Sequence, residues 1–310
     1  LLERSLSLDA LHGRLRDYQL AKRVEESVDW TLGGPTLILA FRPEKNGYVA
    51  VDVVDRPWPD GMGDPEKDSA LFGAWSLSQF GPLTFPQNLE RATQHSYGWP
   101  EAAEVVARHR AFLRVRLSYV FGAEPDALVM PPDYAASPEI DFLTRMASAL
   151  LEDDRALCYF NPGGEVLANR PTFQEVAGYY RDKGLPPLDL WCNRRMFRVS
   201  QDWMVMDLVG LQQFDLPDLE VAFPWRAFDP NDMAPMLVNV GFYLISSGPV
   251  VKEGHTMDGP RGIKFRVKEF EESLMAPPRR TLRFCPDDGS TPPPELGFGP
   301  GKKSWQFWKR

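Results

Sequence analysis

The chain has 310 residues, of which 43% are hydrophobic, 12% aromatic and 25% charged. This apolar fraction is ordinary for a globular protein, so it excludes wholesale disorder, and the length suits two domain-sized units or one elaborated domain. The longest apolar run, residues 237–245, is shorter than the ~18 residues of a membrane span. Residues 1–4 lack the basic-then-apolar plan of a signal peptide. We therefore expect neither a membrane partner nor a secretory signal.

The net charge is -8 and the pI is about 5.2. Binding to nucleic acid requires a cationic surface that neutralises phosphates, so this composition argues against nucleic acid as a partner and favours a basic protein. The three cysteines, Cys158, Cys192 and Cys285, are odd in number and far apart. They predict reduced, buried thiols in a cytoplasmic protein rather than a disulfide framework.

The first predicted element is an amphipathic helix over residues 6–28, because leucines recur there at roughly helical spacing. Residues 36–42 and 48–54 read as a strand pair, with Asn46-Gly47 favouring a tight turn between them. Residues 56–97 are rich in Pro, Gly and aromatic side chains. Because a flexible linker would not carry so many large apolar groups, we interpret this segment as a packed irregular region.

The remaining elements follow from apolar periodicity and from Ser, Asp, Gly and Pro at their ends. In chain order they are a helix at 100–109, a strand at 111–120, a helix from Ser137 to Leu151, a strand at 156–160, a helix at 172–183, a strand pair at 188–199 and 203–211, a helix from Asp229 to Gly248, and strands near 263–267 and 281–284.

This mixture of helices and hairpin-like strand pairs predicts an α+β fold, with mixed or antiparallel sheets flanked by helices. The acidic segment Glu152–Arg155 is the preferred internal boundary, dividing the chain into residues 1–154, residues 155–285 and a Pro/Gly-rich basic-aromatic tail, 286–310. We expect the tail to dock into a groove through Trp305, Phe307 and Trp308.

No familiar catalytic pattern is present. The four histidines, His12, His95, His109 and His255, do not form the His-Glu-x-x-His zinc motif, and there is no Gly-x-Ser-x-Gly elbow. Residues 297–303 resemble a phosphate loop only superficially, because no Ser or Thr follows the first lysine. The sequence therefore predicts a protein that is not an enzyme, with no metal and no cofactor.

Acidic residues are concentrated in three segments. The net charge is -4 over residues 52–68, -7 over residues 124–154 and -6 over residues 201–232, whereas bases outnumber acids after residue 251. Such segments are either ordinary solvated faces or an electronegative surface that steers a basic protein into place. On the second interpretation the candidate partner-binding residues are Asp60, Asp64, Glu66, Asp68, Glu152, Asp153, Asp154, Asp215, Asp218 and Glu220. Trp58, Trp203 and Trp225 lie among the acids and are either core residues or interface anchors.

Several short segments occur in an order that resembles a bacterial family of unknown function found beside type VI secretion genes. The segments are Pro57-Trp58-Pro59, residues 99–103 leading through His109 into 111–120, Leu190-Trp191, Gly210-Leu211 with 215–221, 239–244 and 248–256. The resemblance spans most of residues 36–267 and brings no catalytic residues. It implies a place in secretion gene clusters, where small acidic proteins serve as immunity proteins against a toxin.

Three hypotheses follow for the function. The first is a cytoplasmic immunity protein that neutralises a cognate toxin, a nuclease with a basic surface, through the acidic surface of the chain. The second is a hydrolase that uses carboxylates and His95 or His109. The third is an adaptor or chaperone that loads an effector onto the secretion machine. The sequence does not specify the oligomeric state.

Overall fold

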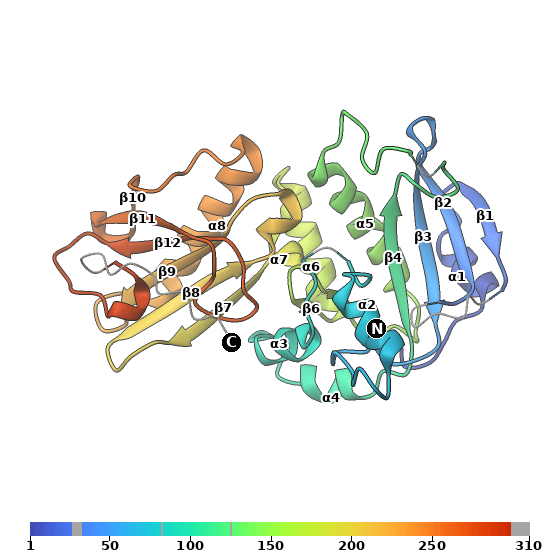
Figure 1. Ribbon diagram of the computed structural model, residues 1–310, viewed down its shortest axis with the longest axis horizontal. Helices are drawn as coiled ribbons and strands as arrows, with labels where there is room; N and C mark the ends of the chain where they lie inside the picture. Colours follow the sequence, from blue (N-terminus) through green and yellow to red (C-terminus); the bar gives the residue numbers. More distant parts are fainter. Residues whose placement is uncertain (27–32, 82, 125, 299–310) are drawn as a thin grey trace. The chain divides into compact units, whose positions relative to one another are not determined.

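The computed structural model describes residues 1–26, 33–81, 83–124 and 126–298, and it divides into two compact units (Figure 1). Unit 1 is Leu1–Trp191 and unit 2 is Cys192–Arg310. The division falls after Trp191 rather than after residue 154, where the acidic segment suggested it. Residues 155–191 are held to unit 1 by contacts such as the 2.8 Å hydrogen bond from the Trp191 indole to the Thr144 hydroxyl.

Unit 1 is built on a four-stranded antiparallel sheet. Its strands, in sheet order, are β1 (Leu20–Val24), β2 (Thr36–Arg42), β3 (Gly47–Val54) and β4 (Phe112–Ser118). Helices α1 (Leu8–Arg14) and α5 (Ala136–Leu150) contribute leucines and Met146 to an apolar core that they share with alternate side chains of β2 and β3 (Figure 1). The predicted strand pair at 36–42 and 48–54 is confirmed, and so is the strand within 111–120.

The predicted helix over residues 6–28 is wrong beyond its first two turns. Helix α1 ends at Arg14, and the chain then forms β1, in which Leu20 pairs with Leu39 and Val24 with Thr36. Leucine spacing reports only local periodicity, so it could not reveal that residues 20–24 pair with β2. The hydrogen bonds to this distant strand override the local helix propensity. Residues 27 and 28 lie outside the described residues.

The segment 56–97 is packed, as expected, but it also contains two short helices. The other helices and strands of unit 1 are α2 (Ser69–Ser76), α3 (Asn88–Gln94), α4 (Ala102–Ala107), β5 (Tyr159–Asn161), β6 (Val166–Ala168), α6 (Arg170–Asp182) and α7 (Leu188–Trp191), with the 3₁₀ turn η1 (Pro43–Lys45) between β2 and β3. The Trp58 ring lies 5.3–6.4 Å from the rings of Trp75, Phe80 and Phe112 in a second apolar core. Trp58 is therefore a core residue of unit 1.

Unit 2 contains a six-stranded mixed sheet. Its strands, in sheet order, are β10 (Thr256–Asp258), β11 (Lys264–Phe270), β12 (Thr281–Pro286), β9 (Asp218–Pro224), β8 (Trp203–Val209) and β7 (Asn193–Arg198). Strands β12 and β9 are parallel, whereas the other neighbours are antiparallel. The 3₁₀ turns are η2 (Leu211–Phe214), η3 (Pro260–Gly262) and η4 (Pro294–Leu296).

Helix α8 (Pro230–Ser247) contacts β8 and β9 of the unit 2 sheet (Figure 1). It begins as predicted, because the Asp229 carboxylate accepts the backbone N–H of Asn231 and Pro230 occupies the first turn. The predicted strand over residues 188–199 is wrong in its first part, where α7 is helical. Strand β9 was missed, because its acidic residues were interpreted as a surface segment.

The α+β class is confirmed. Within the described residues no helix is long and apolar enough to cross a membrane. The predicted docking of Trp305, Phe307 and Trp308 lies outside the described residues.

Candidate acidic interface

The acidic loop, residues 55–68, joins β3 to α2 and is the most exposed of the three acidic segments. Asp55, Asp64, Glu66 and Asp68 are all exposed. Asp64 accepts the backbone N–H groups of Glu66 at 2.8 Å and Lys67 at 3.3 Å, and Asp68 caps α2 by accepting the N–H of Leu71. Asp64 and Asp68 thus hold the conformation of the loop while they face solvent.

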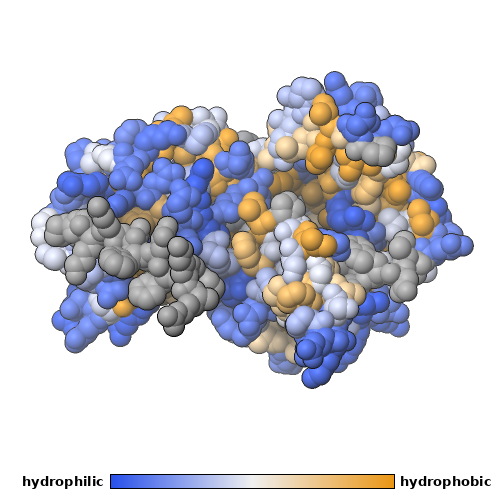
Figure 2. Space-filling view, viewed as in Figure 1, coloured by the Kyte–Doolittle hydropathy of each residue, from blue (hydrophilic) through white to orange (hydrophobic). Residues whose placement is uncertain are grey.

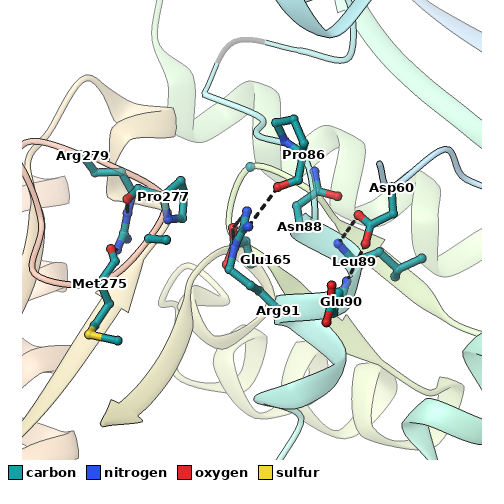
Figure 3. Close-up of polar contacts among 12 residues, drawn as sticks. Asp60, Pro86, Asn88, Leu89, Glu90, Arg91, Glu165, Met275, Pro277 and Arg279 are labelled. Atoms are coloured by element: carbon teal, nitrogen blue, oxygen red, sulfur yellow. Dashed lines mark hydrogen bonds and ion pairs between the residues drawn. The ribbon is translucent and has the colours of Figure 1, made fainter. Parts of the chain in front are cut away.

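Asp60, in the same loop, has a structural role at the start of α3. Its two carboxylate oxygens accept the backbone N–H groups of Leu89 at 2.7 Å and Glu90 at 2.9 Å, at the start of α3 (Figure 3). The N-cap residue of that helix, Gln87, makes no side-chain cap of its own. Asp60 therefore supplies the missing cap from a distant part of the chain, and its carboxylate is less available to a partner than those of its neighbours.

Residues 152–154 follow α5, and the structure separates their roles. Glu152 and Asp154 are exposed, whereas the Asp153 side chain is 5% exposed. Asp153 accepts hydrogen bonds from Arg155 Nε at 2.7 Å and Arg14 Nε at 3.3 Å. These hydrogen bonds, chiefly that from Arg155, hold the pKa of Asp153 well below its usual range. Asp153 therefore stabilises unit 1 and is not available for a partner.

The segment 215–220 in unit 2 is exposed at one end and buried at the other. Asp215 is exposed, but the Asp218 and Glu220 side chains are 1% and 0% exposed. Glu220 lies opposite Asp207 on one neighbouring strand and opposite Arg283 on the other. The expectation that Asp218 and Glu220 bind a partner is therefore wrong, because the sheet buries them.

An arginine network neutralises these buried carboxylates. Asp207 lies 2.6 Å from Arg195 Nη2 and 3.2 Å from Arg279 Nη2. The same Arg279 donates to Asp218 at 2.9 Å, and Arg283 Nε donates to Glu220 at 2.6 Å.

Backbone groups complete the network. Asp218 accepts the N–H groups of Gly210 and Leu211, and Glu220 accepts that of Leu274. Arg279 also donates to the carbonyl oxygens of Met275 and Pro277, whose loop is drawn in Figure 3. Three carboxylates are thus balanced by three guanidinium groups, as buried charges require.

The two histidines of the hydrolase hypothesis have structural contacts. His109 is buried, its Nε2 accepts the Trp58 backbone N–H at 2.9 Å, and its Nδ1 donates to the Val106 carbonyl. Burial lowers the pKa of His109, so the ring stays neutral in one tautomer. His95 Nδ1 lies 2.7 Å from the Tyr97 hydroxyl. With both ring nitrogens occupied, His109 has no free position at which to act as a general base.

The cysteines and tryptophans singled out in the sequence are buried, except for Trp225. Cys158, Cys192 and Cys285 are buried free thiols, as expected, and burial raises the pKa of Cys285 to about 12. Trp203 is buried, whereas Trp225 is 37% exposed beside the guanidinium groups of Arg198 and Arg226. Among the described residues no group of three His, Cys, Asp or Glu side chains could hold a metal ion.

Unit 2 also has a surface groove of about 310 Å³ between α8 and the segment Met257–Pro260. It is lined by apolar side chains such as Met236 and Val240 together with Asp232, Asn239 and Asp258. None of its lining residues is a histidine, a cysteine or a serine, so its titratable side chains are the carboxylates of Asp232 and Asp258.

A feature that the sequence interpretation missed is a run of exposed apolar side chains between β4 and α5. Leu128, Val129 and Met130 are 69%, 71% and 54% exposed. The signal available in the sequence was three consecutive large apolar residues in a Pro-rich segment without any helical or strand periodicity.

Comparison with protein families identifies one matching segment. Residues 207–285 match a family described as "Domain of unknown function (DUF4261)". This segment runs from the last residues of β8 through β9, α8, β10 and β11 into β12, and it includes most of the buried arginine network. No curated protein and no solved structure matches the chain.

Proposed function

We propose that this chain is a cytoplasmic immunity protein that binds a cognate antibacterial toxin and blocks its cationic surface. The observation that carries the proposal is the acidic loop, where five carboxylates stand against Arg56 and Lys67 alone. A nuclease must present a cationic cleft to phosphate, so an exposed acidic loop has the complementary charge. The resemblance to a family beside type VI secretion genes, and within it to the immunity protein TsiT, points to the same role.

The charge distribution supports binding rather than catalysis. Of the candidate partner-binding residues, Asp153, Asp218 and Glu220 are buried in contacts within the chain. The exposed candidates are Asp64, Glu66, Asp68, Glu152, Asp154 and Asp215. Asp64 has one exposed ion-pair partner, Lys67, whose Nζ lies 3.6 Å from it. Exposed carboxylates steer a basic protein over distances of about one Debye length, ~10 Å at 0.1 M salt. We therefore assign the binding role to the exposed acids of unit 1, with the acidic loop as its centre.

The first experiment uses the toxin encoded beside the gene for this chain. The purified chain should form a complex with that toxin and inhibit its nuclease activity, and co-production should protect cells. An effector-loading adaptor would instead be needed for export of the toxin and not for survival of the producer. Failure to form the complex or to protect cells would overturn the proposal.

Two matched charge variants test the location of the interface. The loop variant carries Asp64→Asn, Glu66→Gln and Asp68→Asn, where Asn retains the turn and the helix cap. The control variant carries Glu271→Gln, Glu272→Gln and Glu295→Gln, three exposed acids of unit 2. Because both variants lose the same charge, a loss of inhibition in the loop variant alone reflects position and not net charge.

A further inference from the structure

The apolar loop, residues 127–134, lies between β4 and α5 and exposes an unusual amount of apolar surface. Besides Leu128, Val129 and Met130, Tyr134 is 42% exposed. Figure 1 shows this segment rising beyond the end of β4, and Figure 2 shows orange patches at the same end of unit 1. Runs of consecutive exposed apolar residues are disfavoured on soluble proteins unless they serve an interaction.

The base of the apolar loop is fixed to the sheet. Asp133 lies 2.5 Å from Arg42 Nη2, and this contact lowers the pKa of Asp133. At the end of β4, the Tyr119 carbonyl accepts a 2.6 Å hydrogen bond from Asn46, and the Tyr119 hydroxyl donates to Glu139 of α5. The apolar side chains are thus presented from an anchored base, which reduces the entropy lost on binding.

The charge around the loop selects the kind of partner. No Lys or Arg occurs from residue 117 to residue 144. Asp133 is neutralised by Arg42 and Asp141 by Arg145, but Glu124 and Asp126 are exposed and make no ion pair with any described residue. An apolar tip with unneutralised carboxylates beside it is complementary to an apolar pocket with a cationic rim.

We propose that the apolar loop inserts into the toxin, with Leu128, Val129 and Met130 filling an apolar pocket beside its cationic cleft. This inference rests on the proposed function and names a second contact for it. A second copy of the chain that packs loop against loop is a poorer occupant, because its own Glu124 and Asp126 would meet like charges. An anionic membrane surface would repel the same carboxylates.

The test measures binding of the adjacent toxin by the full chain carrying Leu128→Ser, Val129→Ser and Met130→Ser. We expect about a 100-fold loss of affinity, since apolar anchors at the centre of an interface dominate its energy. The control is the single substitution Leu185→Ser, which removes one apolar side chain, 43% exposed, elsewhere in unit 1 and should leave affinity unchanged. Circular dichroism establishes that both variants are folded.

The outcomes separate the two proposals. If the wild-type chain binds the toxin and the triple variant binds equally well, the insertion is refuted and the immunity function stands. If the wild-type chain does not bind, the immunity function fails and the inference fails with it. Sedimentation velocity tests whether the loop instead joins two copies of the chain. A dimer formed by the wild type but not by the triple variant would identify the loop as a contact between copies and would overturn the insertion.

Discussion

The acidic loop of unit 1 and the acidic segment 215–220 of unit 2 look alike as charge patterns, yet the structure uses them differently. In the loop, Asp64, Glu66 and Asp68 are exposed and lie in turns. In unit 2, Asp218 and Glu220 are buried on a strand that has a neighbour on each side. Local acidity therefore does not distinguish a binding surface from a structural network. What distinguishes them is whether the acidic residues lie in an exposed loop or on a central strand of a sheet.

The difference has a physical origin in the sheet. A carboxylate on a central strand loses its water and must find cations at the facing register positions. Arg195, Asp207, Glu220 and Arg283 occupy such positions on β7, β8, β9 and β12, each opposite the next. The acidic loop has no partner strand, so Asp64, Glu66 and Asp68 keep their water and remain open to another protein.

The largest expected effect comes from breaking the buried network. Arg283→Met leaves Glu220 buried without its cation and should lower the free energy of unfolding by about 3–5 kcal/mol in urea titrations. The control is Arg280→Met, because Arg280 is exposed and lies 4.0 Å from Glu269. Its effect should stay within about 0.5 kcal/mol. Equal losses in the two variants would contradict the distinction between buried and exposed charge.

The two aspartates of segment 215–220 provide a comparison within one stretch of sequence. Asp218→Asn removes the charge that faces Arg279 and should destabilise by about 2–3 kcal/mol. Asp215→Asn should change stability by less than about 0.5 kcal/mol, because Asp215 is exposed and Asn also tolerates its left-handed φ of 58°. Chemical denaturation of both variants measures these losses. A larger loss of stability in Asp215→Asn than in Asp218→Asn would contradict the assignment of Asp218 to the buried network.

Acid titration probes Asp153 in unit 1. Its folded pKa lies below the unfolded value of 3.8, so its contribution is present above that pH and is lost as the pH falls further. Asp153→Asn should cost about 2 kcal/mol at neutral pH and should reduce the dependence of stability on pH below about 4. Thermal unfolding from pH 7 to pH 3 measures both effects. An unchanged pH dependence would show that Asp153 is not the group responsible.

The smallest expected effect on stability is that of neutralising the acidic loop. The loop variant Asp64→Asn, Glu66→Gln, Asp68→Asn should change stability by less than about 1 kcal/mol in total, because its three carboxylates are exposed. Chemical denaturation would contradict this account if the loss approached that of Arg283→Met.

Much of the fold could be predicted from local patterns. The β2–β3 pair follows from alternation around Asn46-Gly47, and α8 follows from Asp229-Pro230. The failures share one cause, which is pairing between distant segments. Strand β1 depends on β2, and the burial of Glu220 depends on Arg283, so neither follows from residues nearby in the sequence.

The site was predictable only in part for the same reason. Glu66 and its neighbours were correctly placed in an irregular segment, but Asp153 could not be distinguished from Asp154 without knowing where Arg14 and Arg155 lie. Alternation of acidic and apolar residues over 218–221, continued by the apolar residues Ala222 and Phe223, was the available sign of a strand with buried charge. The apolar run Leu128–Met130 can also be read from the sequence. Its lack of helical or strand periodicity was the only sign that these side chains are exposed.

The most direct test of the central claim is the affinity of the chain for the adjacent toxin at low and high salt. At about 0.05 M salt the loop variant should bind about 10-fold more weakly than the wild type, and this difference should shrink near 0.5 M as charges are screened. The Glu271→Gln, Glu272→Gln, Glu295→Gln control should bind as the wild type does. Equal binding by the loop variant and the wild type at both salt concentrations would show that the acidic loop does not hold the partner.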